Sequence, residues 1–191
     1  MAIEMWSVIA SVGTFVVITA TAIAAVLQLG HLRAANKVTY IQAFFHEFEG
    51  PELSEAFRFV RNELASRLED PEFREELRAP RGTDRKTHPE ISICNFFDQW
   101  GLYYRDGVID RASFMRVNAG VIVGFWTRLE PVVALVADGT GGSNTAFEQF
   151  EYLTVQARRW RELHPGGSYP PGVERIPLQD PWAEEDRSRL R

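Results

Sequence analysis

The chain contains very little cysteine. Cys94 is the single cysteine among 191 residues. One thiol cannot form an intramolecular disulfide and cannot build a cysteine-rich metal site by itself, so both of these stabilising devices are excluded. A lone cysteine is consistent with a reducing compartment. The plainest interpretation of Cys94 is a small apolar residue buried in a helix.

The sequence also lacks an excess of positive charge. The formal net charge is −5, and no continuous stripe of Lys and Arg with interleaved aromatic residues occurs. Such a chain has no general attraction to phosphate backbones, so nucleic acid is not an expected partner. A length of 191 residues with 45% hydrophobic residues is enough for one packed domain with appendages.

Motifs of the common enzyme classes are missing. There is no Gly-x-Ser-x-Gly elbow, no paired Cys-x-x-Cys and no His-Glu-x-x-His helix. The glycines of residues 138–142 lack the Gly-Lys-Ser/Thr ending of a phosphate loop and are interpreted as a linker. We therefore predict no catalytic, cofactor-binding or metal-binding residue and no cofactor. The histidines lie in four separate segments: His31, His46, His88 and His164.

A long apolar run opens the chain. From Trp6 to Leu29 there is no charged residue, and at about 1.5 Å per residue the run is long enough for roughly 30 Å of hydrocarbon. Glu4 precedes it and Arg33 and Lys37 follow it, so the positive-inside rule predicts an external N-terminus and a cytoplasmic C-terminal part. A cleaved signal peptide is the main alternative, but the basic n-region is missing. A buried core helix would need a larger surrounding domain.

These observations predict an all-α protein with an N-terminal transmembrane helix that continues into an antiparallel helical bundle of about four to five helices. The expected domains are an anchor at 1–30, a cytoplasmic helical bundle at 31–164 and a disordered, proline-rich charged tail at 165–191. The predicted location is the cell inner membrane, with a single pass that contacts lipid through residues 6–29. Small residues four apart in the span, such as Ala20 and Ala24, leave self-association open as an alternative to a membrane protein partner.

Helical periodicity continues beyond the anchor, up to a stop at Gly50-Pro51. Asp70-Pro71 predicts a short further helix, and residues 79–88 read as a surface loop. A helix opening at Pro89-Glu90 ends at Asp106-Gly107 and forms a hairpin with the next helix, which Asp110 caps. The predicted apolar faces comprise Leu53, Phe57, Val60, Leu64 and Leu68; Ile93, Phe96, Phe97, Trp100 and Tyr104; Phe114, Val117, Val121, Phe125 and Leu129; and Phe147, Phe150, Leu153, Ala157 and Trp160.

Three further expectations concern the later helices. Pro131 is expected to bend the helix that Asp110 caps, before that helix reaches Ala137. The stretch 119–137 is apolar enough to raise the question of a second span, but Arg128 and Glu130 near its middle favour a buried core helix. Thr145 and Glu148 have the spacing of a capping box for the last helix.

The N-terminal span, the basic flank HLRAANK, the segment FFDQWGLYYRDGVID and the later FW-x-x-L-x-P motif together resemble a bacterial family, domain of unknown function 4760, over roughly residues 6–163. The resemblance implies a membrane-anchored helical protein of bacteria. It implies no activity, substrate or catalytic residue.

Two functions from different classes follow. The first is an interaction or regulatory module that the anchor confines to the cytoplasmic membrane face, close to a membrane-bound partner. The alternative is a small-ligand-binding or metal-dependent enzymatic helical domain with a polar pocket built on His46, Glu49 and Asp98. This alternative requires the three side chains to converge in one cleft.

Overall fold

The computed structural model describes residues 2–79, 87–141 and 145–189, and within α1 and the C-terminal helix it describes some residues by their backbone alone. The described residues form helices and no strand, which confirms the all-helical class. The helices are α1 (Ala2–Phe48), α2 (Pro51–Asn62), α3 (Leu64–Arg67), α4 (Pro71–Arg78), α5 (Pro89–Arg105), α6 (Arg111–Gly139), α7 (Glu148–Leu163) and α8 (Ala183–Arg189).

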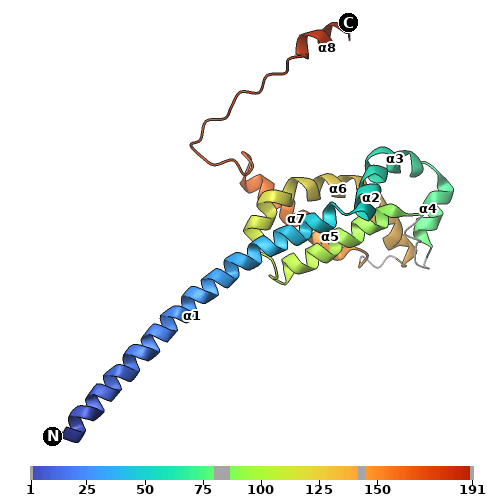
Figure 1. Cartoon of the computed structure of the whole chain (residues 1–191). Helices are drawn as coiled ribbons and strands as arrows, with labels where there is room; N and C mark the ends of the chain where they lie inside the picture. Colours follow the sequence, from blue (N-terminus) through green and yellow to red (C-terminus); the bar gives the residue numbers. More distant parts are fainter. Residues whose placement is uncertain (1, 80–86, 142–144, 190–191) are drawn as a thin grey trace.

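Helix α1 is a single rod that runs through Gly30 without a break. Only its C-terminal end packs on the other helices, and the rest projects away from them (Figure 1). The rod ends at Phe48, and Pro51 occupies the first turn of α2, where its missing N–H is no loss. The predicted stop at Gly50-Pro51 is confirmed.

Helices α2 to α4 form the far end of the domain. The predicted apolar face is confirmed, since Leu53, Phe57, Val60 and Leu64 are buried and Leu68 is partly buried. Asp70 caps α4 by accepting a hydrogen bond from the Glu72 N–H at 2.9 Å. Of the predicted surface loop, residues 80–86 lie outside the described residues, and at its end the prediction is wrong because His88 is buried.

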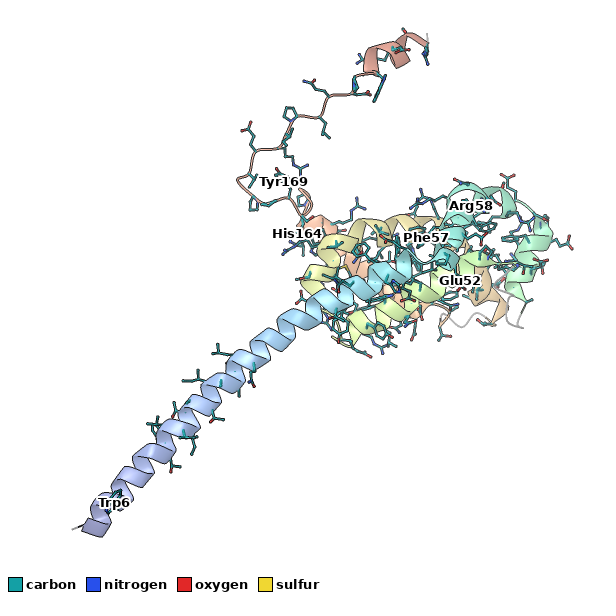
Figure 2. All side chains as sticks on the ribbon, in the orientation of Figure 1. Trp6, Glu52, Phe57, Arg58, His164 and Tyr169 are labelled. Atoms are coloured by element: carbon teal, nitrogen blue, oxygen red, sulfur yellow. The ribbon has the colours of Figure 1, made fainter. Side chains whose placement is uncertain are left out.

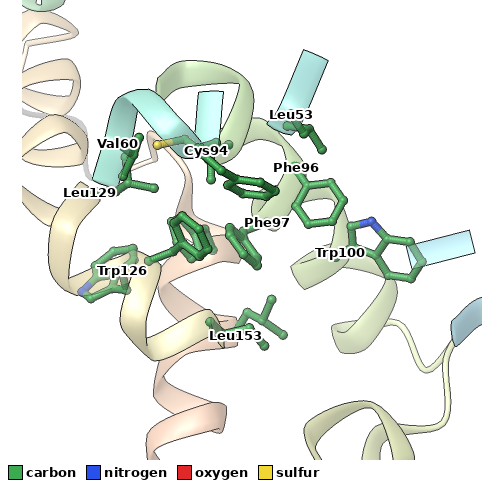
Figure 3. Packing of buried hydrophobic residues seen from close by; sticks show 14 of the residues in the cluster. Leu53, Val60, Cys94, Phe96, Phe97, Trp100, Trp126, Leu129 and Leu153 are labelled. Carbon is green, nitrogen blue, oxygen red and sulfur yellow. The ribbon is translucent and has the colours of Figure 1, made fainter. Parts of the chain in front are cut away.

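The core is unusually aromatic and is centred on α5. All five residues of its predicted apolar face are buried, and the side chains of α5 lie between those of α2, α6 and α7 (Figure 3). Phe44 of α1 enters this core, with its ring 5.0 Å from Trp100 and 5.4 Å from Phe114. The Trp100 indole N–H donates to Glu47 Oε2 at 3.2 Å, which ties α5 to α1 a second time.

The turn between α5 and α6 follows the sequence prediction. Gly107 adopts a φ of 71°, which favours glycine. The Asp110 carboxylate accepts from the Ser113 N–H at 3.0 Å and caps α6. Ile109 and Phe114 flank this cap and are both buried, as a hydrophobic staple requires.

The predicted face of α6 is partly wrong. Val117 and Val121 are 47% and 37% exposed. An α-helix turns about 100° per residue, so residues chosen at four-residue steps move gradually around the helix axis. The face that is buried is therefore rotated by roughly 60° about this axis from the predicted face. The residues buried along this helix are Phe114, Met115, Asn118, Ala119, Ile122, Phe125, Trp126, Leu129 and Val132.

Helix α7 begins differently from the prediction. Its N-cap position is Phe147 in a left-handed conformation, with a φ of 56°, and the helix begins at Glu148, so Thr145 does not occupy the N-cap position that the predicted capping box requires. Asp98 of α5 performs this role through space, because its Oδ1 accepts from the N–H groups of Gln149 at 2.9 Å and Phe150 at 3.1 Å. A Cβ on Gly101 would lie 2.2 Å from the Gln149 carbonyl oxygen, so only glycine permits this close approach of α7.

Among the described residues, one helix is long and apolar enough to cross a membrane, and it is α6; residues 13–28 of α1 form a shorter apolar stretch. Helix α6 packs against α4, α5 and α7 and continues through Pro131 to Gly139. After α7 the chain leaves the domain and extends to α8 (Figure 1).

We expect Trp100→Ala to lower the free energy of unfolding by about 3–5 kcal/mol, because it empties a core site and removes the bond to Glu47. Trp182→Ala is the matched control, since Trp182 is 65% exposed and should change stability little. Chemical denaturation of both variants measures the difference. Equal stabilities would contradict the assignment of Trp100 to the core.

We expect Asp98→Ala to cost about 1–2 kcal/mol of stability through loss of the α7 cap. Asp98→Asn should keep most of it, because an amide oxygen still accepts both hydrogen bonds. Thermal unfolding of the pair provides the test. If the two variants unfold alike, the cap does not depend on the acceptor oxygen.

Candidate functional site

The three side chains of the predicted polar pocket do not converge. His46 lines a surface cleft of about 520 Å³ between α1, α2 and α5, together with Ser92 and Asn95. Glu49 is exposed and does not line this cleft. Asp98 bonds to the α7 backbone instead. The geometry required by the small-ligand alternative is therefore absent from these residues.

A different polar cluster, which the sequence analysis missed, lies where α4 meets the start of α5. His88 is 2% exposed and Glu90 is fully buried. The imidazole Nδ1 lies 2.8 Å from Glu90 Oε1, and Nε2 lies 2.9 Å from Glu76 Oε2. The three side chains thus form a carboxylate–imidazole–carboxylate chain that runs from the core to the half-exposed Glu76.

Aromatic and charged neighbours enclose this chain. The Phe73 ring packs on the His88 ring with centroids 4.7 Å apart, and the Arg67 guanidinium lies 4.9 Å from the centre of the Phe73 ring. Cys94 is fully buried one helical turn after Glu90. Glu90 Oε2 has no hydrogen-bond partner among the described residues.

Burial controls the electrostatics here. Desolvation raises the pKa of Glu90 above its ordinary value, and the hydrogen bond to His88 opposes this rise only in part. Burial, with the nearby Glu90 and Asp98 carboxylates, raises the pKa of Cys94 far above that of a free thiol. Cys94 therefore remains a protonated thiol and is a poor nucleophile.

The cluster is suited to holding the structure together more than to catalysis. His88 joins a side chain of α4 to one of α5 across the connection between the helices. No group of three or more His, Cys, Asp or Glu side chains in the part of the chain that the structure describes could hold a metal ion. The sequence signal for the cluster is weak: it consists of the His-Pro-Glu motif before an apolar helix, and the partner Glu76 comes from a separate helix.

The second notable surface is the apolar part of α1. Phe15, Val16, Val17 and Ile18 are consecutive and each is 58–70% exposed. At about 100° per residue, four consecutive positions cover all sides of a helix. Ile23, Val26 and Leu27 extend the same surface at 57–68% exposure. A contiguous exposed apolar surface of this kind marks an interaction site.

Fold and surfaces define an all-helical protein in which an apolar helical rod is joined to an aromatic-rich domain. The chain belongs to the family described as Domain of unknown function (DUF4760), which matches residues 15–160. The match includes most of the apolar part of α1 as well as the helical domain. Neither the curated proteins nor the solved structures contain a match to the chain.

We expect the Glu90 carboxyl to make stability depend on pH. Folding raises the pKa of Glu90. There is therefore a pH range in which the Glu90 carboxyl is protonated in the folded protein but ionised in the unfolded chain. The resulting stabilisation is complete below the ordinary pKa of 4.5 and is lost as pH rises through the raised value. The unfolding free energy of the wild type, minus that of Glu90→Gln, should therefore fall as pH increases from 4.5.

Denaturant titrations over a pH series measure this difference. Glu75→Gln is the matched control on α4, since the Glu75 side chain is 72% exposed and pairs with Arg78 at the surface. A Glu90→Gln difference that stays flat with pH would contradict the burial argument.

Proposed function

We propose that this protein is a single-pass membrane protein of bacteria, anchored in the inner membrane by residues 6–29 of α1. The observation that carries the proposal is the apolar surface around the whole circumference of α1. A protein partner on one side would leave the other sides in water. A bilayer covers all of them at once.

The rival span, α6, is better suited to the core. Nine of its residues are buried against protein, including Asn118, Phe125 and Trp126. A lipid position for α6 would break its contacts with α4, α5 and α7 and would bring Arg128 and Glu130 into hydrocarbon. The apolar composition of α6 serves helix packing.

Charge favours one orientation. His31, Arg33 and Lys37 follow the apolar segment, whereas Glu4 precedes it. By the positive-inside rule the N-terminus lies outside and the helical domain lies in the cytoplasm. Because α1 is continuous into the domain, the anchor also limits how far the domain moves from the membrane surface.

The helical domain acts as an interaction or regulatory module. Confinement to the membrane surface raises its effective concentration toward a membrane-bound partner or a second copy of the chain. The protonated Cys94 thiol and the engaged Asp98 and His88 side chains favour this function over an enzymatic one.

Paired arginine substitutions in the two apolar helices test the anchor. Val17→Arg with Ile18→Arg places two charges at the centre of the proposed span, at a cost of about 2.5–3.5 kcal/mol for each in membrane insertion. We expect this variant to leave the membrane fraction on alkaline extraction, whereas wild-type protein stays.

Val117→Arg with Val121→Arg is the matched control, because these valines are exposed on α6. We expect this variant to stay in the membrane fraction. Release of the α6 variant, with retention of the α1 variant, would overturn the proposal and assign the span to α6.

A further inference from the structure

One end of the helical domain faces the direction in which α1 leaves it. Along α1, Phe48 contacts Phe96 of α5 and Phe125 of α6, whereas Phe44, one turn closer to the N-terminus, contacts Trp100 and Phe114. Helix α1 is therefore antiparallel to α5 and parallel to α6. The projecting rod leaves the domain at the end formed by the last turn of α5 and the first turn of α6.

Helix α7 ends at the same place. Its first turn is level with the middle of α5 and α6, where Phe150 contacts Phe97 and Trp126. Its last turn meets the α5–α6 turn, because Tyr104, Arg111, Trp160 and His164 line one cleft of about 620 Å³. Figure 2 shows His164 at the end of the domain from which α1 projects.

The two clefts at this end of the domain are lined mainly by basic residues, although the chain as a whole is acidic. The cleft and the one adjoining it are lined by Arg111, Arg116, Arg158 and Arg161, and among the described residues Glu162 is their one acidic lining residue. The whole chain has a net charge of −5. The basic lining of these two clefts therefore contrasts with the net negative charge of the chain.

Most of this charge is available to a ligand. Arg116, Arg158 and Arg161 are exposed and form no ion pair with any residue that the structure describes. Arg111 donates to the carbonyls of Tyr104 and Arg105, which fixes its guanidinium at the C-terminal end of α5. Trp160, stacked on His164 at 4.4 Å, supplies an amphipathic side chain of the kind common at membrane interfaces.

The part of α1 between the proposed anchor and the domain is short, so this end of the domain lies close to lipid. At about 1.5 Å per residue, Phe44 lies about 22 Å from Leu29 along the helix. The headgroup layer occupies about 5–8 Å of that distance. A helix tilt of about 20° shortens the remaining distance between the headgroup layer and the side of the domain that tilts toward the membrane. The level of Phe44, which is also that of Phe114 in the first turn of α6, then lies within one to two Debye lengths, of about 8 Å each, from the headgroup surface.

From this juxtaposition we propose that the arginine-lined end of the domain, formed by Arg111, Arg116, Arg158 and Arg161, docks on the anionic phospholipid headgroups of the leaflet that α1 enters. The proposal rests on the proposed anchoring by α1. The phosphate groups are the complementary charge, and the docked domain holds its α5–α6 turn and the C-terminal end of α7 against the membrane. The rest of the domain surface faces the cytoplasm.

Energy transfer in nanodiscs tests the docking with the full chain. A donor fluorophore is attached to Ser168→Cys, which lines both clefts, while the native Cys94 is buried and protonated and so resists labelling. Acceptor-labelled lipid reports proximity. Transfer should be higher in discs of phosphatidylcholine with phosphatidylglycerol than in phosphatidylcholine alone. It should fall at about 1 M salt, where the Debye length is about 3 Å.

Charge reversal identifies the surface. Arg116→Glu and Arg158→Glu should each lower the ratio of docked to undocked protein at least about fivefold, the effect of one basic residue near an anionic surface. Arg58→Glu is the matched control, because Arg58 is exposed and lies away from His164 (Figure 2). It should leave transfer unchanged. Circular dichroism melts check that all three variants are folded.

The remaining outcomes separate the two proposals. A chain that fails to enter the discs overturns the anchor. A chain that enters them but gives equal transfer in neutral and anionic lipid, or loses transfer equally with Arg58→Glu, overturns the docking alone. If transfer is equal in neutral and anionic discs while inorganic phosphate binds the chain and Arg116→Glu removes that binding, the clefts bind free phosphate, and the lipid assignment is wrong.

Discussion

The insertion of Phe44 into the aromatic core is the contact on which the rest of the structure depends. Its ring is 1% exposed and contacts Phe96, Trp100 and Phe114. Because Phe44 belongs to the same continuous helix as the apolar rod, this contact sets the direction in which the rod leaves the domain. Core packing and the proposed membrane placement are therefore coupled through one helix, since a rigid helix transmits its orientation along its length.

Three polar contacts at this core join one helix to another, whereas the buried Asn118 and Thr154 side chains donate to carbonyls of their own helices. Asp98 of α5 caps α7, Glu47 of α1 accepts from Trp100, and His88 joins Glu76 of α4 to Glu90 of α5. Burying a polar group without a partner is costly, so each of these bonds also selects one arrangement of the helices. The close approach at Gly101 has the same consequence, because a side chain there would displace α7.

The apolar residues of the two long helices differ in their surroundings. Helix α6 buries one face in protein and keeps Val117 and Val121 at the surface, whereas the apolar part of α1 is exposed on all sides. Arginines collect at the end of the domain from which α1 departs. In the proposed arrangement, hydrocarbon covers the rod, headgroups meet the arginines, and the acidic remainder of the chain lies in water.

The sequence by itself determined the helices and most of their apolar faces, because capping residues, prolines and the periodicity of apolar residues act locally. The start of α2 at Pro51, the Asp70 and Asp110 caps and the buried face of α5 were all predictable in this way. Tertiary structure decided the rotation of α6, the cap of α7 by a residue 51 positions earlier, and the burial of His88. It also decided that Glu76, His88 and Glu90 meet and that His46, Glu49 and Asp98 do not. These features depend on which helices lie side by side, and contacts between distant segments leave no periodic signal in the chain.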